Sequence, residues 1–218
     1  MNTRSQAHPA TLTHRATRIL RAASITPLLV ATLLSTAIAA ESIDIGNPKT
    51  PGSTVQSGDA WTIVAGGADV WGSSDQFHFS HQTISGSGAL SVKVESISDS
   101  DPWSKAGVMV RADTAVGAPN AAVFVTNKNG VSFQWRSAPG GPTTSAKVPS
   151  VTAPVWVKLE RHENDFSAFY SDDGKKWTQI GATQTLVMKK SALAGLAATS
   201  HSAALSCTAK LKSFLVKR

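Results

Sequence analysis

Tryptophans beside planar polar groups are the residues of this sequence best suited to a specific chemistry. The 218 residues include six tryptophans and one tyrosine. Three of the tryptophans have such neighbours: Trp71 near Asp69 and Asp75, Trp103 after Asp101-Pro102, and Trp135 between Gln134 and Arg136. Sugar recognition uses aromatic faces for stacking and planar polar groups for paired hydrogen bonds to hydroxyls. The pattern therefore indicates carbohydrate binding, and the competing interpretation is that the tryptophans pack in a core.

Alternation in Val131-Ser-Phe-Gln-Trp-Arg136 predicts a strand with one apolar and one polar face, and Gln134 lies on the polar face. His78 and Arg111 belong to other predicted strands and would extend this polar face if the strands align. Such a face is either a ligand platform or a solvated sheet surface. The residues predicted to bind a ligand are Trp71, His78, Trp103, Arg111, Gln134, Arg136 and His201.

Patterns typical of catalysis are missing from the sequence. Glycosidases need two carboxyl groups that face each other across the scissile bond, and no predicted strand carries a spaced acid pair. There is no Gly-x-Ser-x-Gly elbow, P-loop or dinucleotide fingerprint. His78 and His81 are three apart on a strand, so they point to opposite faces and form no zinc pair. We predict no catalytic residue and no required cofactor. A glycan hydrolase with an unrecognised carboxyl pair stays an alternative.

Three aspartates suggest a structural metal. Asp44, Asp69 and Asp75 lie near predicted strand ends with glycines between them. Calcium prefers carboxylate and carbonyl oxygens, so these residues could form a structural calcium site. The alternative is that they are solvated turn formers.

Period-two alternation predicts the strands that must position these side chains. The predicted strands include 43–45, 60–64, 75–79, 90–94, 121–126, 131–135, 155–159, 165–170, 177–180, 194–199 and 208–216. Asn129-Gly130 between two apolar runs predicts a hairpin, and residues 46–58 are predicted to form a long loop. Many short strands separated by turns indicate an all-β antiparallel sandwich or barrel. Residues 41–218 have the size of a single domain, in which Cys207 is predicted to be buried.

The first 40 residues have the layout of a cleaved export signal. Four arginines precede an apolar run, Ile25 to Ala39, which ends in Ala37-Ile-Ala39. The run is about 15 residues, whereas a membrane span needs roughly 20. No arginine pair precedes it, so the sequence predicts a secreted or periplasmic protein that uses the general export route and has no membrane span after cleavage.

Removal of that segment also changes the charge. The whole chain has 21 basic and 14 acidic residues, and four of the basic ones precede residue 41, so the remainder has 17 against 14, a net charge of +3. The remaining basic residues are scattered, which argues against a nucleic-acid partner.

Several segments carry a family resemblance. They are Gly67 to Phe79, Asp101 to Arg111, Gly130 to Arg136 and Gly195 to His201. In this order they resemble a secreted bacterial module, a concanavalin A-like jelly roll related to the "regulation of enolase" family, over about residues 42–217. The resemblance implies a two-sheet antiparallel sandwich and an accessory, lectin-like role in binding glycans, as in modules appended to glycoside hydrolases. The chain lacks the paired strand carboxylates of hydrolytic members of that superfamily.

The leading hypothesis is therefore a non-catalytic carbohydrate-binding β-sandwich whose partner is a polysaccharide or glycan. The second is a protein-interaction or envelope-structural module whose partners are other extracellular proteins.

Overall fold

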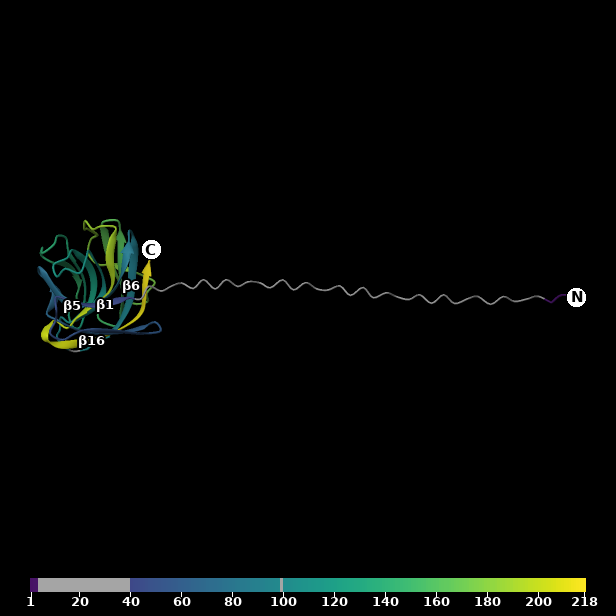
Figure 1. Ribbon diagram of the computed structural model, residues 1–218, viewed down its shortest axis with the longest axis horizontal. Helices are drawn as coiled ribbons and strands as arrows, with labels where there is room; N and C mark the ends of the chain where they lie inside the picture. The colour runs from purple at the N-terminus through teal and green to yellow at the C-terminus, as the bar shows by residue number, and fades with distance from the viewer. Residues whose placement is uncertain (4–39, 99) are drawn as a thin grey trace. The chain divides into compact units, whose positions relative to one another are not determined.

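The computed structural model describes residues 1–3, 40–98 and 100–218 (Figure 1). Every strand of the described residues lies between Glu41 and Lys217. The predicted export signal falls on residues outside the described ranges, apart from residues 1–3 and 40. In those ranges, no helix is long and apolar enough to cross a membrane.

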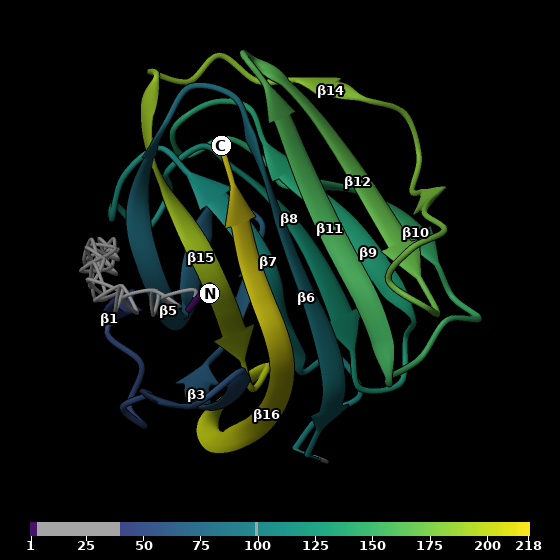
Figure 2. The ribbon, with the colours of Figure 1, turned by 90° about the vertical axis from the view of Figure 1, so that its right-hand side faces the viewer.

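The strands form two antiparallel β-sheets that pack face to face, which confirms the predicted all-β sandwich. In Figure 2, strands β6, β11 and β12 of one sheet run in front of β7, β8 and β9 of the other. The first sheet has the order β1 (Glu41–Ile45), β5 (Ser74–Ser85), β15 (Ser191–Thr199), β7 (Lys105–Arg111), β8 (Asn120–Thr126), β9 (Val131–Arg136) and β10 (Thr144–Val148), and β4 (Asp69–Trp71) pairs with β5.

The second sheet carries the remaining strands. Its order is β13 (Thr178–Gln179), β12 (Asp165–Ser171), β11 (Val155–His162), β6 (Gly88–Ile97), β16 (Ser202–Lys217), β3 (Ala60–Gly67) and β2 (Ser53–Ser57), and β14 (Gln184–Thr185) pairs with β12. Strand β2 corrects the prediction that residues 46–58 form only a loop. Its side chains are mostly exposed, so the segment lacks the apolar alternation that reveals half-buried strands.

The hairpin predicted at Asn129-Gly130 joins β8 to β9. The amide of Thr126 donates to the carbonyl of Gly130 at 2.9 Å, and Gly130 has a φ of 80°. That backbone conformation favours glycine, which explains the turn sequence. The hairpin fixes the register in which Gln134 pairs with Ala122, so the face that carries Gln134 is set by this turn.

Two apolar clusters lie on the two faces of the first sheet. The larger cluster fills the space between the sheets with valine, leucine and isoleucine side chains and includes the predicted buried Cys207. The smaller cluster lies on the face that points away from the second sheet, which we call the outer face. Its buried members are Ile45, Val70, Phe77, Phe79, Met109, Ala122, Phe124 and Ala197. The outer face therefore combines this apolar cluster with buried polar side chains, among them Lys105, Gln134 and Arg136.

Candidate functional site

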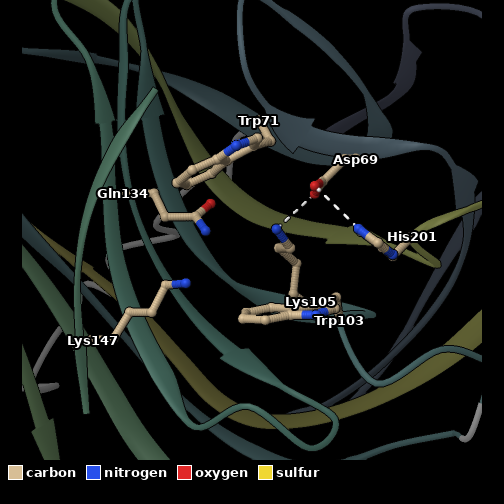
Figure 3. A pocket seen from close by; sticks show the side chains of 7 residues that line it. All are labelled: Asp69, Trp71, Trp103, Lys105, Gln134, Lys147 and His201. Atoms are coloured by element: carbon tan, nitrogen blue, oxygen red, sulfur yellow. Dashed lines mark ion pairs between the residues drawn. The ribbon is translucent and has the colours of Figure 1, made fainter. Parts of the chain in front are cut away.

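A pocket of about 300 Å³ opens on the outer face of the first sheet (Figure 3). Strands β4, β7, β9 and β10 contribute side chains, and so do the loop before β7 and the turn between β15 and β16. The lining residues are Asp69, Trp71, Trp103, Lys105, Gln134, Lys147 and His201. Its volume is at the lower end of the range of ligand sites, about 300–1,000 Å³. Four of the seven residues predicted to bind a ligand are therefore brought together here.

Trp71 and Trp103 lie on opposite sides of the pocket (Figure 3). Trp71 ends β4 and is 40% exposed. Trp103 is held in its loop by Asp101, whose Oδ1 accepts a hydrogen bond from the Trp103 amide at 2.7 Å. The ammonium of Lys147 lies 4.5 Å from the Trp103 ring centroid and 5.9 Å from that of Trp71. A ligand placed between the two indoles could therefore contact both rings, and the ammonium of Lys147 already lies near both.

An ion-paired group lies at the far side of the pocket. Lys105 is only 2% exposed, and its Nζ lies 2.6 Å from Oδ1 of Asp69. His201 Nε2 lies 3.4 Å from Asp69 Oδ2, and its Nδ1 lies 2.9 Å from Asp101 Oδ1 without the alignment of a hydrogen bond. Burial lowers the pKa of Lys105, the charge of Asp69 opposes that shift, and the charge of Lys147 adds to it. The pocket therefore holds its charged groups in a partly desolvated environment.

Gln134 is the most unusual polar residue of the pocket. It is 2% exposed, and its Oε1 finds no hydrogen-bond donor among the described residues. Its neighbour across the β8–β9 ladder is Ala122, whose side chain has no hydrogen-bonding group to offer the amide. A buried acceptor without a donor costs about 1–3 kcal/mol. A ligand hydroxyl or amine that donates to Oε1 would recover that free energy.

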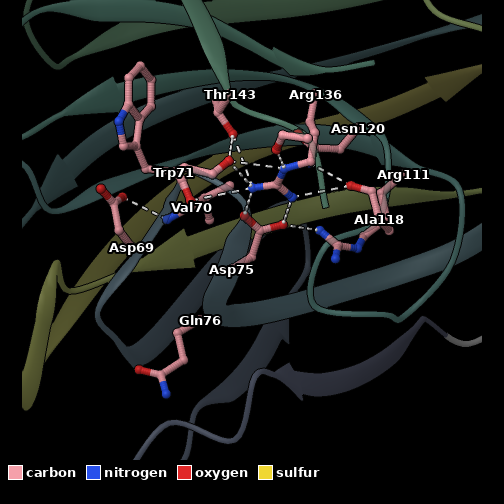
Figure 4. Close-up of polar contacts among 12 residues, drawn as sticks. Asp69, Val70, Trp71, Asp75, Gln76, Arg111, Ala118, Asn120, Arg136 and Thr143 are labelled. Atoms are coloured by element: carbon pink, nitrogen blue, oxygen red, sulfur yellow. Dashed lines mark hydrogen bonds and ion pairs between the residues drawn. The ribbon is translucent and has the colours of Figure 1, made fainter. Parts of the chain in front are cut away.

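Arg111 and Arg136 do not line the pocket, although both lie on the outer face. They are fully buried around Asp75 (Figure 4). Arg136 donates to both oxygens of Asp75, at 2.6 and 2.7 Å, and Arg111 donates to Oδ2 at 2.8 Å. We call these three residues the Asp75 cluster. Burial lowers the pKa of Arg111, and the charge of Asp75 opposes the shift. Both arginines use their donors on this carboxylate and are buried. The prediction that they contact a ligand is therefore corrected: their role is structural.

The Asp75 cluster also positions one wall of the pocket. Arg136 donates to the carbonyl of Gly72 at 3.0 Å and to that of Trp71 at 3.4 Å. Thr143 Oγ1 donates to the same Gly72 carbonyl at 2.9 Å. These bonds hold the turn after β4 against the first sheet, so Arg136 and Thr143 fix the backbone that carries Trp71.

His78 lies on the opposite face of its strand from the pocket. Strand pairing places Phe79, not His78, in line with the residues of the outer face. The ring of His78 instead contacts Asp44 through Nδ1 at 2.8 Å and Thr54 Oγ1 through Nε2 at 3.0 Å. The predicted alignment of His78 with Gln134 is therefore wrong, because the alternation of β5 directs the phenylalanines to the outer face.

The three aspartates proposed for calcium do not converge on one site. Asp44 contacts His78 and the Gly52 amide, Asp69 pairs with Lys105, and Asp75 holds the two arginines. Among the described residues there is no cluster of three or more metal-ligating acidic, histidine or cysteine side chains. The carboxylates are instead neutralised by separate cationic or amide partners.

Sequence reasoning missed both lysines of the pocket. Lys105 alternates with Gly107, Met109 and Arg111, so the period of two could have placed it on the same face as Arg111. Lys147 lies on β10, whose sequence Thr144-Ser-Ala-Lys-Val148 has little apolar alternation. No local signal marks that strand, and only the pairing of Lys147 with Ser132 brings it to the pocket.

No protein-family model matches the chain, and no curated protein matches it either. The membership predicted from the resemblance to the "regulation of enolase" family therefore stays a prediction.

Solved structures with the same fold exist. A protein of unknown function from Saccharomyces cerevisiae is 14% identical with a TM-score of 0.63, and the match covers 82% of this chain and 96% of that one. The carbohydrate-binding module CBM66 from Bacillus subtilis is 14% identical with a TM-score of 0.54, covering 83% and 98%. A mutant of the GH43 protein BlXynB from Bacillus licheniformis is 14% identical with a TM-score of 0.54, covering 76% of this chain but 38% of that one. These similarities show that the chain has a two-sheet β-sandwich fold shared with such proteins.

Proposed function

We propose that the protein is a non-catalytic carbohydrate-binding module and that its glycan binds in the pocket between Trp71 and Trp103. One observation carries the proposal: two indole faces flank a pocket in which the buried Oε1 of Gln134 has no donor among the described residues. Sugar rings present an apolar face for stacking and hydroxyls that donate hydrogen bonds, so a sugar satisfies both features at once. The fold shared with a carbohydrate-binding module supports the same interpretation.

The lining of the pocket favours binding over hydrolysis. Asp69 is the single carboxylate among the lining residues, and it is ion-paired with Lys105 at 2.6 Å. Glycosidases require a second carboxyl group across the bond, roughly 5–10 Å away. The lining supplies no such pair, so we propose a role in attachment or delivery. We propose that this role is carried out in the periplasm or outside the cell, in line with the export signal predicted from the sequence.

Titration of the full chain with soluble polysaccharides tests the proposal, with intrinsic tryptophan fluorescence as the readout. We expect a saturable change, and Trp103→Ala should weaken binding at least tenfold because it removes one stacking face. Trp177→Ala is the matched control, since Trp177 also contacts a lysine, Lys158 at 4.7 Å, but lies on the second sheet. A flat response across a broad panel, checked on a glycan array, would contradict the proposal and favour a protein partner.

A further inference from the structure

The pocket has an excess of positive charge, which a neutral sugar would not compensate. Two ammonium groups, Lys105 and Lys147, line it with one carboxylate, Asp69. Asp69 lies 2.6 Å from Lys105, whereas Lys147 has no carboxylate within ion-pair distance in residues 40–98 and 100–218. Its side chain is exposed to solvent, and its ammonium lies over the faces of Trp103 and Trp71. The pocket thus contains one cation without an anionic partner.

The two lysines also act on each other. Lys105 is 2% exposed, whereas Lys147 is exposed to solvent, so their repulsion acts across a pocket that water can enter and is weakened by that water. The positive charge of Lys147 lowers the pKa of Lys105, in the same direction as burial does. A bound anion would relieve this repulsion, while a neutral ligand that excludes water from the pocket would increase it.

The position of Lys147 relative to the indoles matters for the same reason. Its ammonium lies 4.5 Å from the ring centroid of Trp103, over the surface that a stacked sugar ring would cover. A neutral ring that displaces the ammonium offers it hydroxyl acceptors but no anionic partner. A ring that carries a carboxylate supplies an ion pair in place of the cation–π contact.

We propose that the glycan bound here is acidic, with a uronic acid residue whose carboxylate pairs with the ammonium of Lys147. This inference rests on the proposed function and names its ligand class. The sugar ring stacks between Trp71 and Trp103, and one of its hydroxyls donates to Oε1 of Gln134. Lys105 stays paired with Asp69.

The test compares acidic oligosaccharides with neutral partners of equal length. Suitable pairs are oligogalacturonate with its methyl ester and oligoglucuronate with the corresponding glucan, titrated into the full chain by calorimetry at low salt. We expect the acidic member of at least one pair to bind at least tenfold more tightly. Added salt should reduce this preference, because screening weakens the ion pair. Lys147→Gln should abolish it, since glutamine keeps the polar side chain without the charge.

Lys158→Gln is the matched control. Lys158 also lies against aromatic rings, at 4.4 Å from Phe169 and 4.7 Å from Trp177, but it is on the second sheet, so the preference should be unchanged. Equal or tighter binding of the neutral members overturns the inference and leaves the proposed function intact. So does an acidic preference that survives in Lys147→Gln, or binding of dextran sulfate in place of every uronate. Absence of binding by all members overturns the inference, and the proposed function is then decided by the broad polysaccharide panel and the glycan array.

Discussion

On the outer face of the first sheet, the Asp75 cluster and the pocket both pair a carboxylate with cationic side chains. The cluster has a structural role, whereas the pocket is the candidate binding site. In the Asp75 cluster, one carboxylate receives two arginines, and all three side chains are fully buried. In the pocket, Asp69 receives Lys105 but is 24% exposed, and Gln134 nearby keeps an acceptor without a donor. A polar residue on this face is therefore structural where loops cover it and available where they do not.

The covering loops account for the difference. Arg136 donates to backbone carbonyls of Gly72, Ala118 and Gly141, which come from three separate connections between strands. These connections close over the guanidinium and use its donors. No comparable set of carbonyls surrounds Lys147, which lies against two indole rings. The lengths and paths of the loops, more than the identity of the charged residues, determine that the Asp75 cluster is structural and that the pocket is open to a ligand.

The largest effect is expected for Asp75→Asn. The substitution removes the charge that compensates Arg111 and Arg136 in a fully buried environment, and breaking such a pair costs about 3–5 kcal/mol. Chemical denaturation of the full chain measures the free energy of unfolding. Asp59→Asn is the control, because Asp59 is exposed and its ion pair with Lys212 is 3.9 Å long. Equal losses in both variants would contradict the structural role of the cluster.

A smaller loss is expected for Asp69→Asn, about 1–3 kcal/mol, because Asp69 is partly exposed while Lys105 is buried. The variant leaves a buried ammonium without its carboxylate. Lys105→Met in the same background should restore most of the stability, since an apolar side chain of similar size needs no partner. Denaturant unfolding of the two variants checks this order. No recovery in the double variant would mean that Asp69 acts through another contact.

The sequence supports the fold better than the site. Alternation and the Asn129-Gly130 turn were sufficient for the sandwich and for the face that carries Gln134, because both are local patterns. Trp71, Trp103 and His201 were selected by residue type, and the structure brings them together. The separation of Arg136 from the pocket and the arrival of Lys147 depend on contacts between distant segments. No local pattern encodes those contacts, which is why the sequence predicted ligand contacts for Arg136 and none for Lys147.

Gln134→Leu sharpens the comparison between the Asp75 cluster and the pocket, because it should stabilise the fold while it weakens ligand binding. Removal of a buried acceptor without a donor recovers about 1 kcal/mol, which raises the unfolding free energy measured by denaturation. Binding of the glycan by the same variant should fall, since the hydroxyl loses its acceptor. A loss of stability instead would show that Oε1 has a partner in solution, and the pocket would then resemble the Asp75 cluster.

The smallest effect is the dependence of stability on pH through Lys105. Burial places its folded-state pKa below the unfolded value of 10.5, with Asp69 opposing the shift. Between the two values the unfolded chain binds more protons at this residue, so stability contributed by Lys105 rises with pH in that window and is constant outside it. The difference in unfolding free energy between the wild type and Lys105→Met, followed from pH 7 upward, isolates this contribution from other titrating groups. Curves that stay parallel as the pH approaches 10.5 would mean that water reaches Lys105 in the folded protein. The pocket would then be more open around Lys105 than the 2% exposure of this residue implies.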